Sequence, residues 1–158
     1  MPTGPGRTAA SHRLPVPHTA VEFLILADRA EVLNGKLYMM GGAWDHIFVA
    51  NIEQPVDINL TCCALVPYSE TDDMHTMEIA ITDPDGGAVH PPFSVSFKTG
   101  RPPDLERGAF TRVPIAAGAR IKFPKYDCYT VAAVVDDRPD SGRRLAFYVK
   151  DPQAAPGK

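Results

Sequence analysis

The sequence contains no long hydrophobic run. Its longest apolar segments, such as FLILA and VAAVV, fall far short of the roughly 18–20 residues that a membrane-spanning helix needs. The first twenty residues, MPTGPGRTAASHRLPVPHTA, also lack the apolar region of a secretory signal. If Met1 is the natural start, these two absences predict a cytoplasmic protein without a membrane partner.

Neither sign of charge is in marked excess. The 16 lysines and arginines are set against 19 aspartates and glutamates, which gives a formal net charge of −3. The chain therefore lacks the general basic footprint of proteins that bind nucleic acid or anionic lipid. We expect no nucleic-acid partner.

Cysteine is scarce. Cys62, Cys63 and Cys128 are an odd number, which favours reduced thiols over a disulfide framework. A Cys62–Cys128 bridge between two predicted strands is the alternative. The cysteines form no C-x-x-C pair and the five histidines have no paired spacing, so no metal site and no cofactor are predicted.

Proline and glycine, in contrast, are abundant. The 16 prolines and 12 glycines interrupt the chain often, which favours short strands and turns over long helices. The length of 158 residues suits one domain. Residues 1–20 and 151–158 hold little that could be buried, so we expect two disordered tails around a folded domain of residues 21–150.

The clearest local feature is a predicted hairpin. Asn34-Gly35 lies between two apolar stretches, and this pair is typical of a two-residue type I′ turn, which places Val32 opposite Leu37. The adjacent Gly41 and Gly42 predict a bulge or bend ahead of Trp44. Asn34, Gly35, Gly41 and Gly42 are thus assigned structural roles.

Alternating apolar and polar residues predict most of the remaining strands. PVDINLTCCALVP, HTMEIAIT, FSVSF and the two arms of YDCYTVAAVVDDRPDSGRRLAFYVKD all alternate, with DDRPDSG as the last loop. FTRVPIAAG predicts a weaker strand that ends near Pro114. About eight strands and no amphipathic helix indicate an all-β fold, with a closed barrel as one solution. We expect an antiparallel β-sandwich, immunoglobulin-like or jelly-roll-like.

One stretch carries a family resemblance. FLILADRAEVLNGKLYMMGGAWDHI has an apolar strand, AD-x-A, a glycine turn and KLY-x-x-GG-x-W. It resembles the N-terminal signature of an uncharacterised bacterial family of small β-sandwich proteins. The resemblance implies the fold and a bacterial, cytoplasmic setting, and it implies no activity. An immunoglobulin domain proper is not indicated, because Trp44 precedes both Cys62 and Cys128.

No catalytic residue is predicted. Asp45 and His46 are adjacent, so on a strand they would point to opposite faces, and no nucleophile lies in a recognisable motif. DPDGG begins like a calcium loop, but the glycine and glutamate that would complete it are missing. Turn-forming aspartates explain this segment without a metal.

These observations leave three hypotheses. The first is a non-catalytic module that binds another protein or a second copy, with Tyr38, Trp44, Asp45 and His46 as interaction residues. For a lone tryptophan such as Trp44, packing in the core is the commoner role. The second is a small-ligand or carbohydrate-binding module, which would need a cleft among exposed aromatic residues: Tyr38, Trp44, Tyr68 and Tyr148. The third is a hydrolase, which would need a pocket uniting His46 or His75 with acids.

Overall fold

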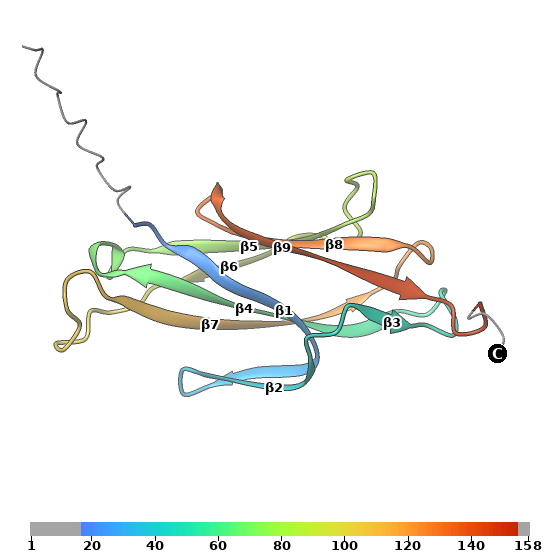
Figure 1. The fold of residues 1–158 in the computed structure, drawn as a ribbon, viewed down its shortest axis with the longest axis horizontal. Coiled ribbons are helices and arrows are strands. Elements are labelled where there is room, and N and C mark those ends of the chain that lie inside the picture. The colour runs from blue at the N-terminus through green and yellow to red at the C-terminus, as the bar shows by residue number, and fades with distance from the viewer. Residues whose placement is uncertain (1–16, 155–158) are drawn as a thin grey trace, which may run out of the picture.

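The structure, a computed structural model, describes residues 17–154 and is built from strands (Figure 1). The elements are β1 (Ala20–Leu33), β2 (Lys36–Gly42), β3 (His46–Phe48), β4 (Val56–Pro67), the short 3-10 helix η1 (Tyr68–Glu70), β5 (His75–Thr82), β6 (Phe93–Phe97), β7 (Phe110–Ile121), β8 (Cys128–Val135) and β9 (Arg138–Lys150). The all-β prediction is confirmed.

The strands form two sheets. The first has the order β2-β1-β4-β7 and is antiparallel throughout. The second has the order β3-β9-β8-β5-β6 and is mixed, because β3 runs parallel to β9. The described part of the chain has nine strands, in agreement with the expectation of about eight. The expectation that all strands pair antiparallel was wrong for the β3–β9 pair.

A single apolar core joins the two sheets. Figure 1 shows β5, β8 and β9 in one layer above β1, β4 and β7, and inward side chains of both layers belong to one buried cluster. Alternation along β5 illustrates the cause, since Met77, Ile79 and Ile81 are buried and the residues between them are not. The rings of Phe123, Tyr129 and Phe147 pack together at one end of the core, with centroids 4.9 to 6.0 Å apart.

Strand β7 is longer than predicted. Pro114 was expected to end it, but β7 continues to Ile121 and pairs with β4 along its whole length. Proline is tolerated here because β7 is the edge strand of its sheet and needs hydrogen bonds on one side only.

The DDRPDSG segment is likewise mostly strand. Val135 pairs with Arg138, so the loop between β8 and β9 holds only Asp136 and Asp137. Both have positive φ, 52° and 54°, which is the backbone of a type I′ turn. Aspartate tolerates this conformation better than most residues, so the turn forms without the glycine of an Asn-Gly or Asp-Gly pair.

The tails predicted for residues 1–20 and 151–158 lie largely outside the described residues, which exclude 1–16 and 155–158. The ordered body starts before residue 21, because β1 begins at Ala20 and Thr19 is already buried. Residues 17–154 contain no helix with the length and apolarity required to cross a membrane.

Candidate functional site

The β1–β2 hairpin extends beyond the two layers as an arm, defined here as residues 29–42. Asn34 and Gly35 form its turn, with φ of 51° and 72°, as a type I′ geometry requires. The register aligns Val32 with Leu37. In Figure 1 the arm lies below the layer that contains β4 and β7.

The arm separates from the body where β1 changes partner. β1 pairs with β4 from Ala20 to Ala27 and with β2 from Ala27 to Leu33, so both partners meet β1 at Ala27. The Asn59 side-chain amide donates to the Asp28 carbonyl at 2.9 Å and holds this point. On the returning strand Gly41 has φ +60°, and a Cβ there would collide with the Asp28 carboxylate. The bend expected at the two glycines is thus set by the close approach of Gly41 to β1.

The arm exposes an unusual number of apolar side chains. Leu33, Tyr38 and Met40 share the face that points away from the sheet and are 51%, 52% and 71% exposed. The opposite face is only loosely covered: Met39 approaches the hydroxyl of Thr61 on β4 at 3.8 Å. A hollow of about 570 Å³ lies along the arm and is lined by Arg29, Ala30, Glu31, Tyr38, Met39, Met40 and Asn59.

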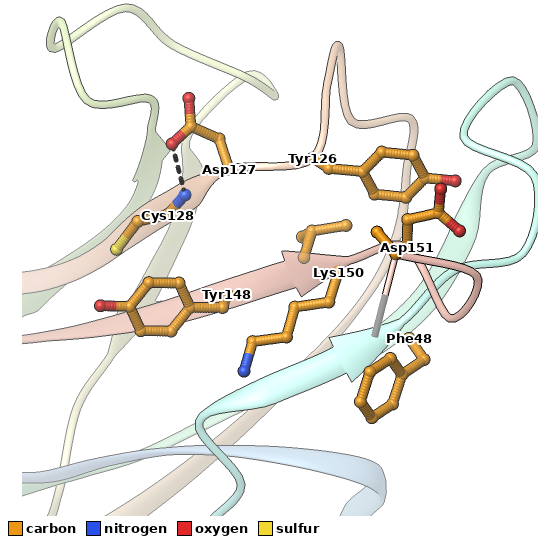
Figure 2. Close-up of a pocket in the computed structure, with 9 residues that line it drawn as sticks. Phe48, Tyr126, Asp127, Cys128, Tyr148, Lys150 and Asp151 are labelled. Atoms are coloured by element: carbon orange, nitrogen blue, oxygen red, sulfur yellow. Dashed lines mark hydrogen bonds between the residues drawn. The ribbon is translucent and has the colours of Figure 1, made fainter. Parts of the chain in front are cut away.

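A second hollow lies across the ends of β3, β8 and β9 (Figure 2). It encloses about 640 Å³ and is lined by Phe48, Tyr126, Asp127, Cys128, Tyr148, Val149, Lys150, Asp151 and Ala154. Figure 2 shows the Tyr148 ring and the Lys150 side chain on the same side of β9, with the ammonium 5.5 Å from the ring centroid. Aromatic faces beside charged groups could hold a small polar ligand.

Of the four predicted interaction residues, Tyr38 lies on the arm and Trp44 does not project into solvent. Trp44 is half-buried against the core, edge-on to Phe147 with centroids 6.1 Å apart. Its indole Nε1 is buried and has no hydrogen-bond partner among the described residues. The structure therefore places Trp44 with the core rather than on an exposed interaction surface.

Asp45 and His46 form a surface pair. The expectation that they point to opposite faces is wrong, because β3 begins only at His46 and Asp45 precedes the strand. The Asp45 carboxylate and His46 Nδ1 are 2.7 Å apart, and this hydrogen bond lowers the pKa of Asp45. The His46 ring is edge-on to Phe48, at the border of the second hollow.

The sequence did not reveal a buried polar network around His75. His75 Nδ1 contacts the Asp136 carboxylate at 2.8 Å, and Nε2 lies 3.1 Å from the Glu70 carbonyl and 3.4 Å from the Thr19 hydroxyl. The Thr19 hydroxyl and amide both donate to the Glu70 carboxylate, at 2.6 and 2.7 Å. His75 lies on the buried face of β5 together with Met77, and two of its partners, Asp136 and Thr19, come from distant parts of the chain, which the sequence pattern does not show.

This network has the residue types of a hydrolytic triad but not its chemistry. Burial alone would lower the pKa of His75, but hydrogen bonds to Asp136 and to the Glu70 carbonyl outweigh it and raise the pKa. Each ring nitrogen also faces an acceptor oxygen, the Asp136 carboxylate at Nδ1 and the Glu70 carbonyl at Nε2, so neither nitrogen is directed at a substrate as a general base would be. The hydroxyl of Thr19 is committed to Glu70, and Thr19 is buried. We therefore assign the network a structural role.

Other reactive groups are dispersed. Cys62, Cys63 and Cys128 are all free thiols, so the Cys62–Cys128 alternative is wrong. Burial raises the pKa of Cys62 to about 12, which makes that thiol a poor nucleophile. In the described part of the chain no three His, Cys, Asp or Glu side chains gather as metal ligands would.

The fold and these surfaces define the chain as an all-β domain of two sheets with a projecting hairpin arm. The model of a family of unknown function, DUF6941, matches residues 22–150, and the chain belongs to this family. No match was found among curated proteins.

Proposed function

We propose that this protein is a non-catalytic protein-interaction module of the bacterial cytoplasm, a β-sandwich of the immunoglobulin-like or jelly-roll-like type that binds its partner through the arm. The single observation that carries the proposal is the exposure of Leu33, Tyr38 and Met40 on one face of the arm. Single exposed apolar residues are common on any protein, but several on one hairpin are not.

The arm is also chemically suited to binding rather than to catalysis. A tyrosine and flexible methionines beside Arg29 and Glu31 provide an apolar centre with a charged border, which is the usual composition of a protein interface. Methionine adapts its shape to a partner at little cost, since it is unbranched and its thioether is polarizable.

A site-specific photocrosslinker tests this proposal. In one variant a benzophenone side chain replaces Tyr38 on the arm. In a second variant it replaces Tyr148 in the second hollow, and both variants are expressed in the native cell. The two tyrosines are a matched pair because they are 52% and 49% exposed. We expect a crosslinked protein from position 38 and none from position 148. Crosslinking from position 148 alone would assign binding to the other surface and refute the proposal.

The second hollow supports one alternative function, the binding of a small polar ligand such as a carbohydrate. Phe48 and Tyr148 are 57% and 49% exposed, and stacking faces of this kind hold sugar rings. Of the aromatic residues expected around such a cleft, only Tyr148 lies in this hollow; Tyr38 is on the arm and Tyr68 is covered by Arg101. Titration with an oligosaccharide panel, with Tyr148→Ala as control, tests this alternative.

A further inference from the structure

Four strands lie at the outer edges of the two sheets: β2, β7, β3 and β6. On the arm β1 has an open edge too, because residues 29–33 pair only with β2, but this edge carries the charges of Arg29 and Glu31. An exposed edge is a template for a further strand, and proteins commonly block it with proline, charge or shortness. β7 carries Pro114 with Arg112 and Arg120, β3 has three residues, and β6 has five and follows Pro91-Pro92. β2 has seven residues, no proline and one charge, Lys36, at its first position. Of the four outermost strands, β2 alone has none of these blocking features along its length, and it is the less charged of the two open edges of the arm.

The backbone groups available on this edge follow from the hairpin. Leu33 and Lys36 flank the two-residue turn and form the hydrogen-bonded pair that closes it. In an antiparallel ladder such pairs alternate with pairs whose N–H and C=O point outward, which assigns the outward groups to Leu37 and Met39. No other described residue bonds to the backbone of Leu37 or Met39. These groups are free to accept another strand.

We infer that β2 pairs with β2 of a second copy of this chain, antiparallel across a two-fold axis at Met39. The inference rests on the proposed function and names its partner. Met39 is the midpoint of Lys36–Gly42, so an axis there brings the part of the strand between the turn and the bend at Gly41 against its copy. Because Met39 has outward-pointing groups, the two Met39 residues form a hydrogen-bonded pair, and each Tyr38 lies opposite Met40 of the other copy.

The side chains of the arm are self-complementary in this arrangement. Lys36 of each copy lies opposite Gly42, so no like charges meet across the axis. Within one arm Glu31 is beside Tyr38 and Arg29 is beside Met40. Each row of the combined sheet therefore runs Glu31, Tyr38, Met40, Arg29, with an acid at one end and a base at the other. The next row, Ala30, Met39, Met39, Ala30, is apolar throughout, as expected of an isologous contact.

The β2–β2 interface is small, and its size determines the affinity that we expect and the method that can detect the dimer. Seven residues on each side bury less than the standard interface of roughly 1,600 Å². We therefore expect a reversible dimer with a dissociation constant on the order of micromolar, seen by sedimentation equilibrium across micromolar concentrations of the full chain.

A charge exchange tests both the surface and the register. One variant carries Tyr38→Lys and Met40→Lys, and the other carries Tyr38→Glu and Met40→Glu, all on the exposed face of the arm. Each variant alone places like charges opposite one another, so we expect at least a tenfold weaker dimer. Mixing the two places opposite charges in register and should restore dimerisation. The control, Ser94→Lys with Ser96→Lys on the edge strand β6, should dimerise like the wild type.

The results that would overturn β2 self-pairing differ from those that would refute the arm as a protein-binding surface. A wild type that stays monomeric, a dimer unaffected by the arm variants, or weakened variants that do not recombine would each overturn the β2 pairing. In the Tyr38 crosslinking experiment, a product of about twice 17.1 kDa supports self-pairing. A product of another mass that depends on the arm would overturn self-pairing and leave the arm as a protein-binding surface. No product from position 38 refutes the proposed function itself.

Discussion

At the scale of single residues, the network around His75 links three parts of the chain. His75 begins β5, Asp136 forms the β8–β9 turn, and Glu70 and Thr19 join the segment after β4 to the start of β1. Burial would raise the pKa of Glu70, but hydrogen bonds from Thr19 and His18 outweigh it and lower the pKa to about 2. Both ionised groups therefore stabilise the native state.

The network predicts a specific pH dependence. The folded pKa of His75 is raised above the usual 6.5, so its contribution is complete below pH 6.5 and is lost as the pH rises through the folded value. Glu70 contributes above its usual 4.5 and loses this contribution as the pH falls toward 2. Urea unfolding from pH 5 to 9 should show the alkaline loss in the wild type and not in His75→Gln. An unchanged profile in His75→Gln would contradict this role.

Trp44 gives a second prediction. Because its ring packs edge-on against Phe147 but is only half-buried, Trp44→Ala should lower the free energy of unfolding by about 2–3 kcal/mol, less than a fully buried aromatic would. Its dimerisation should match that of the wild type, as measured by sedimentation under conditions where the variant is folded. A stable variant that no longer associates would return Trp44 to the interaction surface.

At the scale of elements, the turns determine how accurately strand boundaries can be predicted from the sequence. Asn34-Gly35 was predictable because both positions need positive φ and these residues supply it most readily. Asp136-Asp137 has the same geometry without glycine, so the sequence of DDRPDSG predicts only a loop and not this turn. Pro114 misled for a related reason, since proline ends a central strand but is accepted on an edge, and edge position is a property of the sheet.

The β8–β9 turn can be improved by substitution. Asp137 has φ 54°, and its side chain makes no hydrogen bond among the described residues, so Asp137→Gly should raise the free energy of unfolding by about 0.5–1 kcal/mol. Asp136→Ala is the informative contrast. Asp136 accepts from His75 and from the Thr76 amide, so its loss should destabilise by about 1–3 kcal/mol. Equal effects of the two substitutions in chemical denaturation would argue against this division of roles.

At the scale of the whole molecule, the two sheets share one core, and the arm lies outside it. Alternation in β5 and β8 was sufficient to predict their core residues, because a half-buried strand shows its buried face in sequence. Strand β4 also alternates in sequence, but the prediction that it is half-exposed was wrong, because Thr61 and Cys63 on its second face are buried as well. The direction of the arm was not predictable. It depends on β1 exchanging β4 for β2 near Asp28, and a partner exchange leaves no periodic trace. The sequence therefore indicated Tyr38 as an interaction residue but gave no reason to group Leu33 and Met40 with it.

The central claim is that the open edge of β2 is the contact surface, and amide hydrogen exchange by NMR tests it most directly. The Met39 amide points outward, whereas that of Tyr38 points toward β1 and is an internal reference. In the wild type at high concentration the Met39 amide should be protected, and on dilution or in the Tyr38→Lys/Met40→Lys variant it should exchange far faster. If the Met39 amide exchanges at one rate under all these conditions, the edge of β2 is not in contact with any partner and the claim fails.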